Sequence, residues 1–140
     1  GTVLTAEDAH AAIDAGASCL VSPVLGTEVG EVAVQRDVAW MPGIATPTEA
    51  YAAHQAGAPL QKIFPMPGIG AAWVKAIRGP MPFLNLVPTH GVHENNAASF
   101  LKAGAHAVGF VQSVFDPNDI AERRWHKIKE KAEKALASVR

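Results

Sequence analysis

Lys62 is the residue whose setting in the sequence most strongly indicates chemistry. It lies in the segment Leu-Gln-Lys-Ile-Phe-Pro-Met-Pro-Gly at 60–68, among apolar neighbours and just before two prolines. Apolar neighbours desolvate an amine, which lowers its pKa and exposes the neutral form as a nucleophile. Such an amine attacks a ketone and forms a Schiff base. The alternative reading is a lysine whose stem packs against the domain while its head stays in water.

Short loops rich in Pro, Gly, Ser and Thr follow most of the other apolar runs. They are Ser-Pro-Val at 22–24, Met-Pro-Gly-Ile-Ala-Thr-Pro at 41–47, Val-Pro-Thr-His-Gly at 87–91 and Val-Gln-Ser at 111–113. The carboxyl ends of parallel strands meet at one edge of a sheet, and in barrel enzymes that edge carries the active site. The loops are therefore expected to form one shared face with Lys62.

Three segments with a common plan must position these loops. Each has polar starters, an Ala-rich amphipathic helix, the tripeptide Ala-Gly-Ala and an apolar run, and they span 5–23, 46–65 and 93–112. Polar residues are expected to cap the helix starts, namely Thr5, Thr46 or Thr48, and Asn95. The glycines of the tripeptides are expected to end the helices in left-handed backbone, namely Gly16, Gly57 and Gly104.

The glycine spacing predicts a further strand–helix unit inside each gap, which gives six β/α units in one domain over 1–140. Strands are expected near 1–4, 18–22, 38–42, 60–64, 83–88 and 106–111, with further helices at 28–37, 70–79 and 117–139. Strict alternation predicts an α/β fold with a parallel sheet. The loop chemistry favours a (β/α)8 TIM-barrel type over an open doubly wound sheet. Since such a barrel has eight units, we expect it to be incomplete at the N-terminus, with two units preceding Gly1.

Composition excludes several classes of protein. Twelve basic and thirteen acidic side chains leave a net charge of −1, so no nucleic-acid partner is expected. No apolar stretch is long enough to span a bilayer, and no membrane association is expected. Cys19 is the only cysteine, which excludes an intrachain disulfide and a zinc–thiolate cluster, and a buried, inert thiol is expected. A cytoplasmic location is expected because the sequence shows neither a spanning stretch nor a signal peptide. The six histidines show no metal-ligand spacing, so no metal is expected.

Six short motifs in order give the chain a family resemblance. They are Gly-Thr-Val-Leu at 1–4, Ser-Pro at 22–23, Pro-Gly-Ile-Ala-Thr-Pro-Thr-Glu-Ala at 42–50, Lys-Ile-Phe-Pro at 62–65, Val-Pro-Thr-His-Gly at 87–91 and Gly-Phe-Val-Gln-Ser at 109–113. The set resembles 2-keto-3-deoxy-6-phosphogluconate aldolases and their sister 4-hydroxy-2-oxoglutarate aldolases. The match covers essentially the whole chain.

The resemblance implies a class I aldolase in which Lys62 forms the Schiff base with a 2-keto acid. The protonated imine then accepts electrons as the bond between C3 and C4 breaks, which releases an aldehyde and leaves pyruvate as an enamine. Matching positions give a substrate-binding set of Thr2, Pro23, Phe64 and Thr89, and a phosphate-binding set of His90, Gly91 and Ser113. No cofactor is implied. The family also implies a homotrimer, for which Trp40, Trp73 and Phe83 are interface candidates, although we expect each in the core.

The chain also departs from the family pattern. His90 replaces a glycine of the usual phosphate loop, while Val111 and Gln112 occupy the second loop, where backbone should approach the phosphate closely. His90 is thus either a plain surface histidine or a residue that reshapes the anion site. The family's catalytic glutamate and a substrate-binding arginine would precede Gly1. Two other functions stay open: an impaired barrel fragment that only binds small anions, and a phosphate-binding barrel isomerase without imine chemistry.

Overall fold

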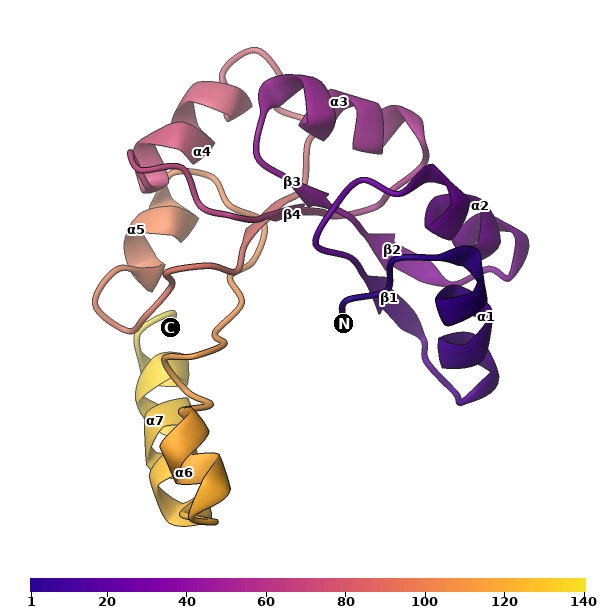
Figure 1. Cartoon of the computed structure of the whole chain (residues 1–140). Coiled ribbons are helices and arrows are strands. Elements are labelled where there is room, and N and C mark those ends of the chain that lie inside the picture. Colours follow the sequence, from indigo (N-terminus) through magenta and orange to yellow (C-terminus); the bar gives the residue numbers. More distant parts are fainter.

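A computed structural model of the chain describes residues 1–140, and its strands and helices form an arch (Figure 1). The helices lie along the outer side of the arch and the strands along its inner side. The elements in chain order are α1 (Ala6–Asp14), β1 (Cys19–Val21), α2 (Thr27–Gln35), β2 (Ala39–Met41), β3 (Gly43–Ile44), α3 (Pro47–Gln55), β4 (Gln61–Ile63), α4 (Ala71–Arg78), β5 (Leu86–Pro88), α5 (Ala97–Lys102), α6 (Pro117–Ala121) and α7 (Trp125–Ala137). The predicted α/β alternation is confirmed.

All strand pairs are parallel, as predicted. β1 pairs with β2, while β3, β4 and β5 form a second group in that order. The single strand expected at 38–42 and continuing to Ile44 is divided, because Pro42 has no N–H to donate to a ladder. Its carbonyl still accepts a 2.9 Å hydrogen bond from the backbone N–H of Lys62. The two groups therefore follow one another along the arch.

The strands expected at 1–4 and 106–111 are not formed. Backbone hydrogen bonds nevertheless hold both runs beside their expected neighbours: one comes from the first run and two come from the second, of which His106 N–H to Leu86 O measures 2.9 Å. Val3 N–H donates to Val21 O at 3.1 Å, and Gly109 N–H donates to Pro88 O at 2.8 Å. Neither run makes enough consecutive bonds for a ladder, but both lie at the ends of the sheet, as predicted.

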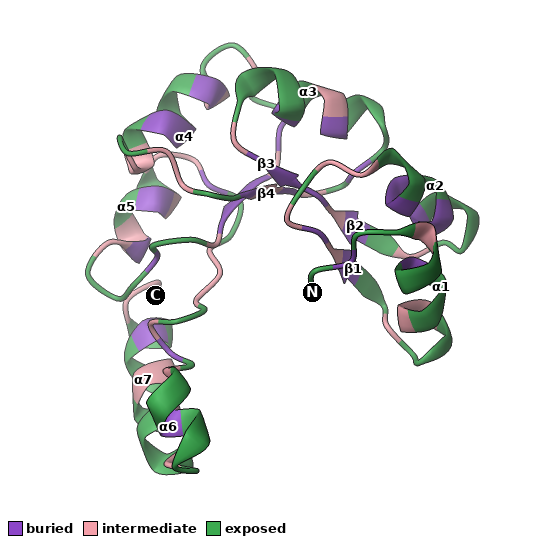
Figure 2. Ribbon diagram, in the orientation of Figure 1, coloured by how far each residue is buried: buried purple, intermediate pink, exposed green.

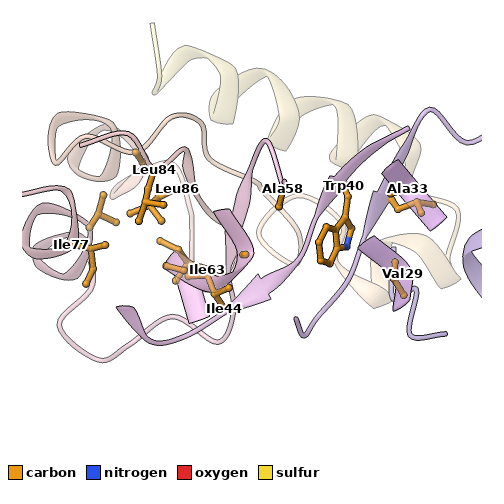
Figure 3. Close-up of a cluster of buried hydrophobic side chains, with 14 of the residues drawn as sticks. Val29, Ala33, Trp40, Ile44, Ala58, Ile63, Ile77, Leu84 and Leu86 are labelled. Carbon is orange, nitrogen blue, oxygen red and sulfur yellow. The ribbon is translucent and has the colours of Figure 1, made fainter. Parts of the chain in front are cut away.

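Alternate strand residues point outward and pack beneath the helices. Leu20, Trp40, Ile44, Ile63 and Leu86 are each at most 2 % exposed and belong to one cluster of buried side chains. Figure 2 shows where the buried residues lie, and Figure 3 shows Trp40, Ile44, Ile63 and Leu86 within the cluster. Burying an aliphatic side chain of this size contributes about 1.5–3 kcal/mol. This cluster is the main attachment of the outer helices to the strands.

The inner face of β1 and β2 is open, and this overturns the burial expected for Cys19. The thiol is exposed, and Ala39, its partner in the ladder, is exposed as well. Strand side chains alternate between faces, so residues adjacent to Leu20 and Trp40 must face away from the helices. An apolar sequence context did not reveal which face the thiol occupies.

The three aromatic residues considered for core or interface differ in their burial. Trp40 and Trp73 are buried in the core, as expected. Phe83 is 47 % exposed, so the expectation of a core position is wrong for this residue. Its ring lies against those of His54 and Tyr51, with centroids 4.7 and 6.5 Å away.

Two of the three expected helix caps are confirmed. Thr5 accepts from Asp8 N–H, and Thr46, rather than Thr48, forms a capping box with Glu49. The cap expected from Asn95 is wrong: Asn96 occupies that position, and its side chain bonds to the preceding loop instead of the helix. The three Ala-Gly-Ala glycines adopt positive φ angles at the helix ends, as predicted for Gly16, Gly57 and Gly104.

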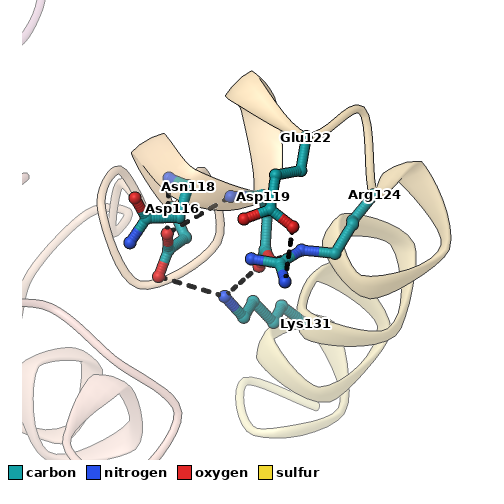
Figure 4. A network of polar contacts seen from close by, with 6 residues as sticks. All are labelled: Asp116, Asn118, Asp119, Glu122, Arg124 and Lys131. Carbon is teal, nitrogen blue, oxygen red and sulfur yellow. Dashed lines mark hydrogen bonds and ion pairs between the residues drawn. The ribbon is translucent and has the colours of Figure 1, made fainter.

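The helix expected at 117–139 is interrupted, and the pair α6–α7 extends away from the arch (Figure 1). Arg123, with φ of +53°, turns the chain between them. Buried Asp119 joins the two helices, because its carboxylate accepts from Lys131 at 2.6 Å and pairs with Arg124 at 2.8 Å (Figure 4). The hydrogen bond from Lys131 lowers the pKa of Asp119 and raises that of Lys131.

No helix in the structure combines the length and the apolar character that crossing a membrane requires.

Candidate active site

A cavity of about 450 Å³ lies at the carboxyl ends of β4 and β5. It is lined by Val21, Lys62, Phe64, Thr89, His90, Gly91, Val92, His93, Val111, Gln112 and Ser113. The ends of β4 and β5 and the loop at 111–113 thus meet at one place, as the strand-end pattern predicts. The loops at 22–24 and 41–47, which were expected at the same face, contribute no lining residue.

Lys62 lies in β4, between the buried side chains of Gln61 and Ile63. Its alternation with these neighbours turns it toward the cavity, and its side chain is half-buried. Desolvation by the surrounding protein lowers the pKa of the Lys62 amine. The Nζ atom lies 4.8 Å from the ring centroid of Phe64, a residue of the expected substrate-binding set.

Thr89 comes directly after β5 and reaches the same cavity. Its hydroxyl donates to Ile63 O at 3.4 Å, which links the ends of the two strands. Its methyl carbon lies 3.0 Å from the position that a Cβ on Gly109 would take. A larger residue at 109 would press on Thr89, so this glycine lets the last apolar run approach the site closely. The predicted proximity of Lys62 and Thr89 is confirmed by their shared cavity.

Two loops form the remaining wall. Ser113 donates its hydroxyl to Val92 O at 2.8 Å, which ties the loop after β5 to the loop at 111–113. The backbone N–H groups of Gly91 and Ser113 have no acceptor within the protein. Free N–H donors at a glycine turn are suited to an anion.

Histidines contribute two imidazoles to this wall. His90 accepts a 3.4 Å hydrogen bond from Met66 N–H through Nδ1, and its ring lies edge-on to that of Phe64 at 5.8 Å. His93 also lines the cavity, although the sequence reasoning did not select it. The available signal was its place in the same loop, three residues after His90.

Two residues of the expected substrate-binding set do not line the cavity. Thr2 is exposed and has a φ of +62°. The carbonyl of Pro23 packs onto Gly43, where an added Cβ would lie 2.1 Å from the oxygen. Pro23 thus joins the end of β1 to β3. The structure brings together Lys62, Phe64, Thr89, His90, Gly91 and Ser113, but not these two.

The arrangement can add an amine to a carbonyl. A partly desolvated lysine faces a cavity that supplies an aromatic ring, a threonine hydroxyl and several N–H donors. No lining residue is a carboxylate. The cavity can therefore hold a negatively charged ketone without repulsion from its own walls.

The family model described as KDPG and KHG aldolase matches residues 1–131. The chain belongs to this family.

Curated relatives carry matching names. The chain is 36 % identical over 118 residues to a probable 2-dehydro-3-deoxy-6-phosphogalactonate aldolase of Rhizobium meliloti, a match that covers 84 % of this chain and 56 % of that protein. It is 33 % identical over 124 residues to the 2-dehydro-3-deoxy-6-phosphogalactonate aldolase of Escherichia coli, which covers 88 % and 60 %. The chain therefore spans a little over half the length of these relatives.

Solved structures with the same fold cover nearly the whole chain. A native KDPGal structure superposes with a TM-score of 0.86 at 29 % identity, covering 99 % of this chain and 68 % of that one. The KDPG aldolase of Legionella pneumophila, with pyruvate captured as a covalent carbinolamine, gives 0.86 at 26 %, covering 99 % and 66 %. A cube-shaped cage designed by fusing symmetric oligomeric domains gives 0.89 at 29 %, covering 99 % and 50 %.

Proposed function

We propose that the protein is a lyase that cleaves a 2-keto acid to pyruvate and an aldehyde through a Schiff base on Lys62. The observation that carries the proposal is the half-buried Lys62 amine, whose pKa is lowered by desolvation and which faces a cavity rich in hydrogen-bond donors. The carbinolamine captured in the Legionella aldolase supports the same chemistry for the family. The substrate is a 2-keto-3-deoxy-6-phosphogluconate-like or a 4-hydroxy-2-oxoglutarate-like acid.

The neutral Lys62 amine adds to the C2 ketone, and the carbinolamine loses water to give an iminium ion. A base takes the proton of the C4 hydroxyl, the C3–C4 bond breaks, and its electron pair moves to C3 as the iminium becomes an enamine. The aldehyde leaves, C3 takes up a proton, and water hydrolyses the imine to pyruvate and free Lys62. None of the residues that line the cavity contributes a carboxylate to these proton transfers.

The lining residues divide into two sets. Thr89 binds the substrate carboxylate, and Phe64 packs beside the imine. Gly91, Ser113 and His90 bind the distal phosphate or carboxylate, a role that their free N–H groups support. Thr2 and Pro23 lie outside the cavity, and no contact with the substrate is assigned to them.

The architecture proposed for the active enzyme is a TIM-type barrel of eight β/α units, of which this chain supplies about six. The open inner face of β1 and β2 and the partial coverage of the relatives support this. We also propose a homotrimer, which agrees with the symmetric oligomeric domains used in the designed cage. The single cysteine supports a location in the cytoplasm.

The test is pyruvate release, measured with a coupled dehydrogenase, from the phosphorylated acid and from 4-hydroxy-2-oxoglutarate. We expect release from at least one substrate and none from Lys62→Arg. His90→Gly is expected to change the ratio of the two cleavage rates. A ratio near one that His90→Gly leaves unchanged would contradict the distal site. No release, together with retained binding of 3-phosphoglycerate, would instead support the impaired, anion-binding alternative.

A further inference from the structure

His93 is an exposed histidine that lines the cavity and has no part in the function proposed above. Two other lining residues adjoin its loop: Gly91 lies two positions earlier, and Ser113 is bonded to Val92. His93 thus belongs to the wall whose N–H groups have no acceptor within the protein.

Asn96 fixes both the loop and the imidazole of His93. Its Oδ1 accepts from the backbone N–H of His93 at 2.9 Å, and its Nδ2 donates to Gly91 O at 2.9 Å. These two bonds settle which end of the amide is nitrogen. The same Nδ2 lies 3.0 Å from His93 Nε2. An amide nitrogen only donates, so Nε2 must accept, and in the neutral ring the proton is on Nδ1.

The same logic applies to His90. Its Nδ1 accepts from the backbone N–H of Met66, which leaves the proton on Nε2. Each of the two imidazoles therefore has one nitrogen occupied as an acceptor by the protein and one N–H donor left over. Separate protein donors impose this state on the two rings.

Donors also predominate elsewhere in the cavity. The Ser113 hydroxyl already donates to Val92 O, and no carboxylate lines the walls. Lys62 is the one cationic side chain among the lining residues. Away from the lysine, a bound group meets mainly N–H donors. These donors favour the binding of an oxyanion over that of a cation or of an apolar group without hydrogen-bond acceptors.

We propose that His93 is a specificity-determining residue that donates its Nδ1–H to an oxyanion, phosphate or carboxylate, at the substrate end away from the ketone. Asn96 is its positioning residue, because it holds the ring in the donor tautomer and the Gly91 carbonyl in place. This inference rests on the function proposed for Lys62 and adds a determinant that belongs to neither of the substrate sets assigned above.

The first test compares three probes on the full chain. They are 3-phosphoglycerate with a phosphate end, 2-oxoglutarate with a carboxylate end, and pyruvate with neither. His93→Ala is expected to weaken the binding of one of the first two probes by about tenfold or more, because a hydrogen bond to a charged group is lost. The affected probe identifies the oxyanion. Pyruvate trapping on Lys62 should be unchanged, and His106→Ala, at an exposed histidine outside the cavity, should match the parent.

Unchanged affinity for both anionic probes in His93→Ala would overturn the inference, whereas failure of pyruvate trapping in the parent would count against the Lys62 function instead. The second test reads the tautomer directly. A long-range ¹H–¹⁵N spectrum with neutral imidazoles should show His93 protonated on Nδ1, and Asn96→Ala should shift its population toward the Nε2–H form. A parent His93 protonated on Nε2 would contradict the proposed arrangement.

Discussion

The ends of β4 and β5 and the helix pair α6–α7 both gather polar side chains, but they treat them in opposite ways. In the helix pair, Lys131 and Arg124 both form ion pairs with the Asp119 carboxylate, at 2.6 and 2.8 Å (Figure 4). At the strand ends, the Lys62 amine has no ion-pair partner, and the N–H groups of Gly91 and Ser113 have no acceptor.

The difference distinguishes polar groups that hold the fold from polar groups that are available to a ligand. Paired charges stabilise each other's charged forms, which is why the pKa of Asp119 falls while that of Lys131 rises. An unpaired, desolvated amine is shifted toward its neutral form, and the pKa of Lys62 falls for this reason. Only the second arrangement supplies a nucleophile.

The largest expected effect comes from removing the unpaired amine. Lys62→Arg should abolish pyruvate release from the 2-keto acid substrates, because a guanidinium stays protonated and cannot form the imine. The measurement is the cleavage rate at saturating substrate. The control is Lys75→Arg, at an exposed position of α4 outside the cavity. Residual cleavage in Lys62→Arg close to that of the control would show that another group performs the chemistry.

The second prediction concerns the close packing that supports the strand ends. Gly43→Ala should lower the free energy of unfolding by about 1–3 kcal/mol or more, because its Cβ would lie 2.1 Å from Pro23 O. Gly79→Ala is the matched control, since its Cβ would find only ordinary contacts of 3.5 Å or more. Urea denaturation measures both. Equal stability of the two variants would show that the β1–β3 junction is looser than the structure indicates.

A smaller and local effect is expected from the paired region. Asp119→Asn should loosen α6 from α7 and speed proteolytic cleavage near Arg123, because Lys131 and Arg124 lose their shared carboxylate. The readout is limited proteolysis with mass spectrometry. Glu133→Gln serves as the control, since its exposed pair with Lys129 is 3.8 Å long and contributes little.

The comparison requires that Asp119→Asn leave pyruvate trapping on Lys62 unchanged. A loss of trapping in this variant would mean that the helix pair and the strand ends are not the separate regions described here.

The sequence supported the fold where local chemistry determines it. Helix starts at Thr5 and Thr46 and the turn at Gly57 follow from side-chain caps and glycine backbone freedom. Two failures were of another kind. The break at Arg123 and the exposure of Cys19 depend on tertiary contacts and on which face the helices cover, and neither is encoded by the neighbouring residues.

The site was predictable to a similar extent. Lys62, Thr89 and Gly91 converge because parallel strands deliver their ends to one edge. Two features escaped the sequence. Pro23 packs against Gly43 instead of lining the cavity, and Asn96 fixes the tautomer of the His93 imidazole. Both depend on loop conformations that alternation and propensity do not determine.

The most direct test of the central claim is borohydride trapping with pyruvate, followed by peptide mapping, over a range of pH. The claim predicts a single adduct on Lys62, whose rate of formation rises with pH and levels off below the ordinary lysine range, because a lowered pKa yields the neutral amine earlier. Lys75, exposed on α4, should remain unmodified under the same conditions. Absence of an adduct on Lys62, or equal labelling of Lys62 and Lys75, would contradict the account.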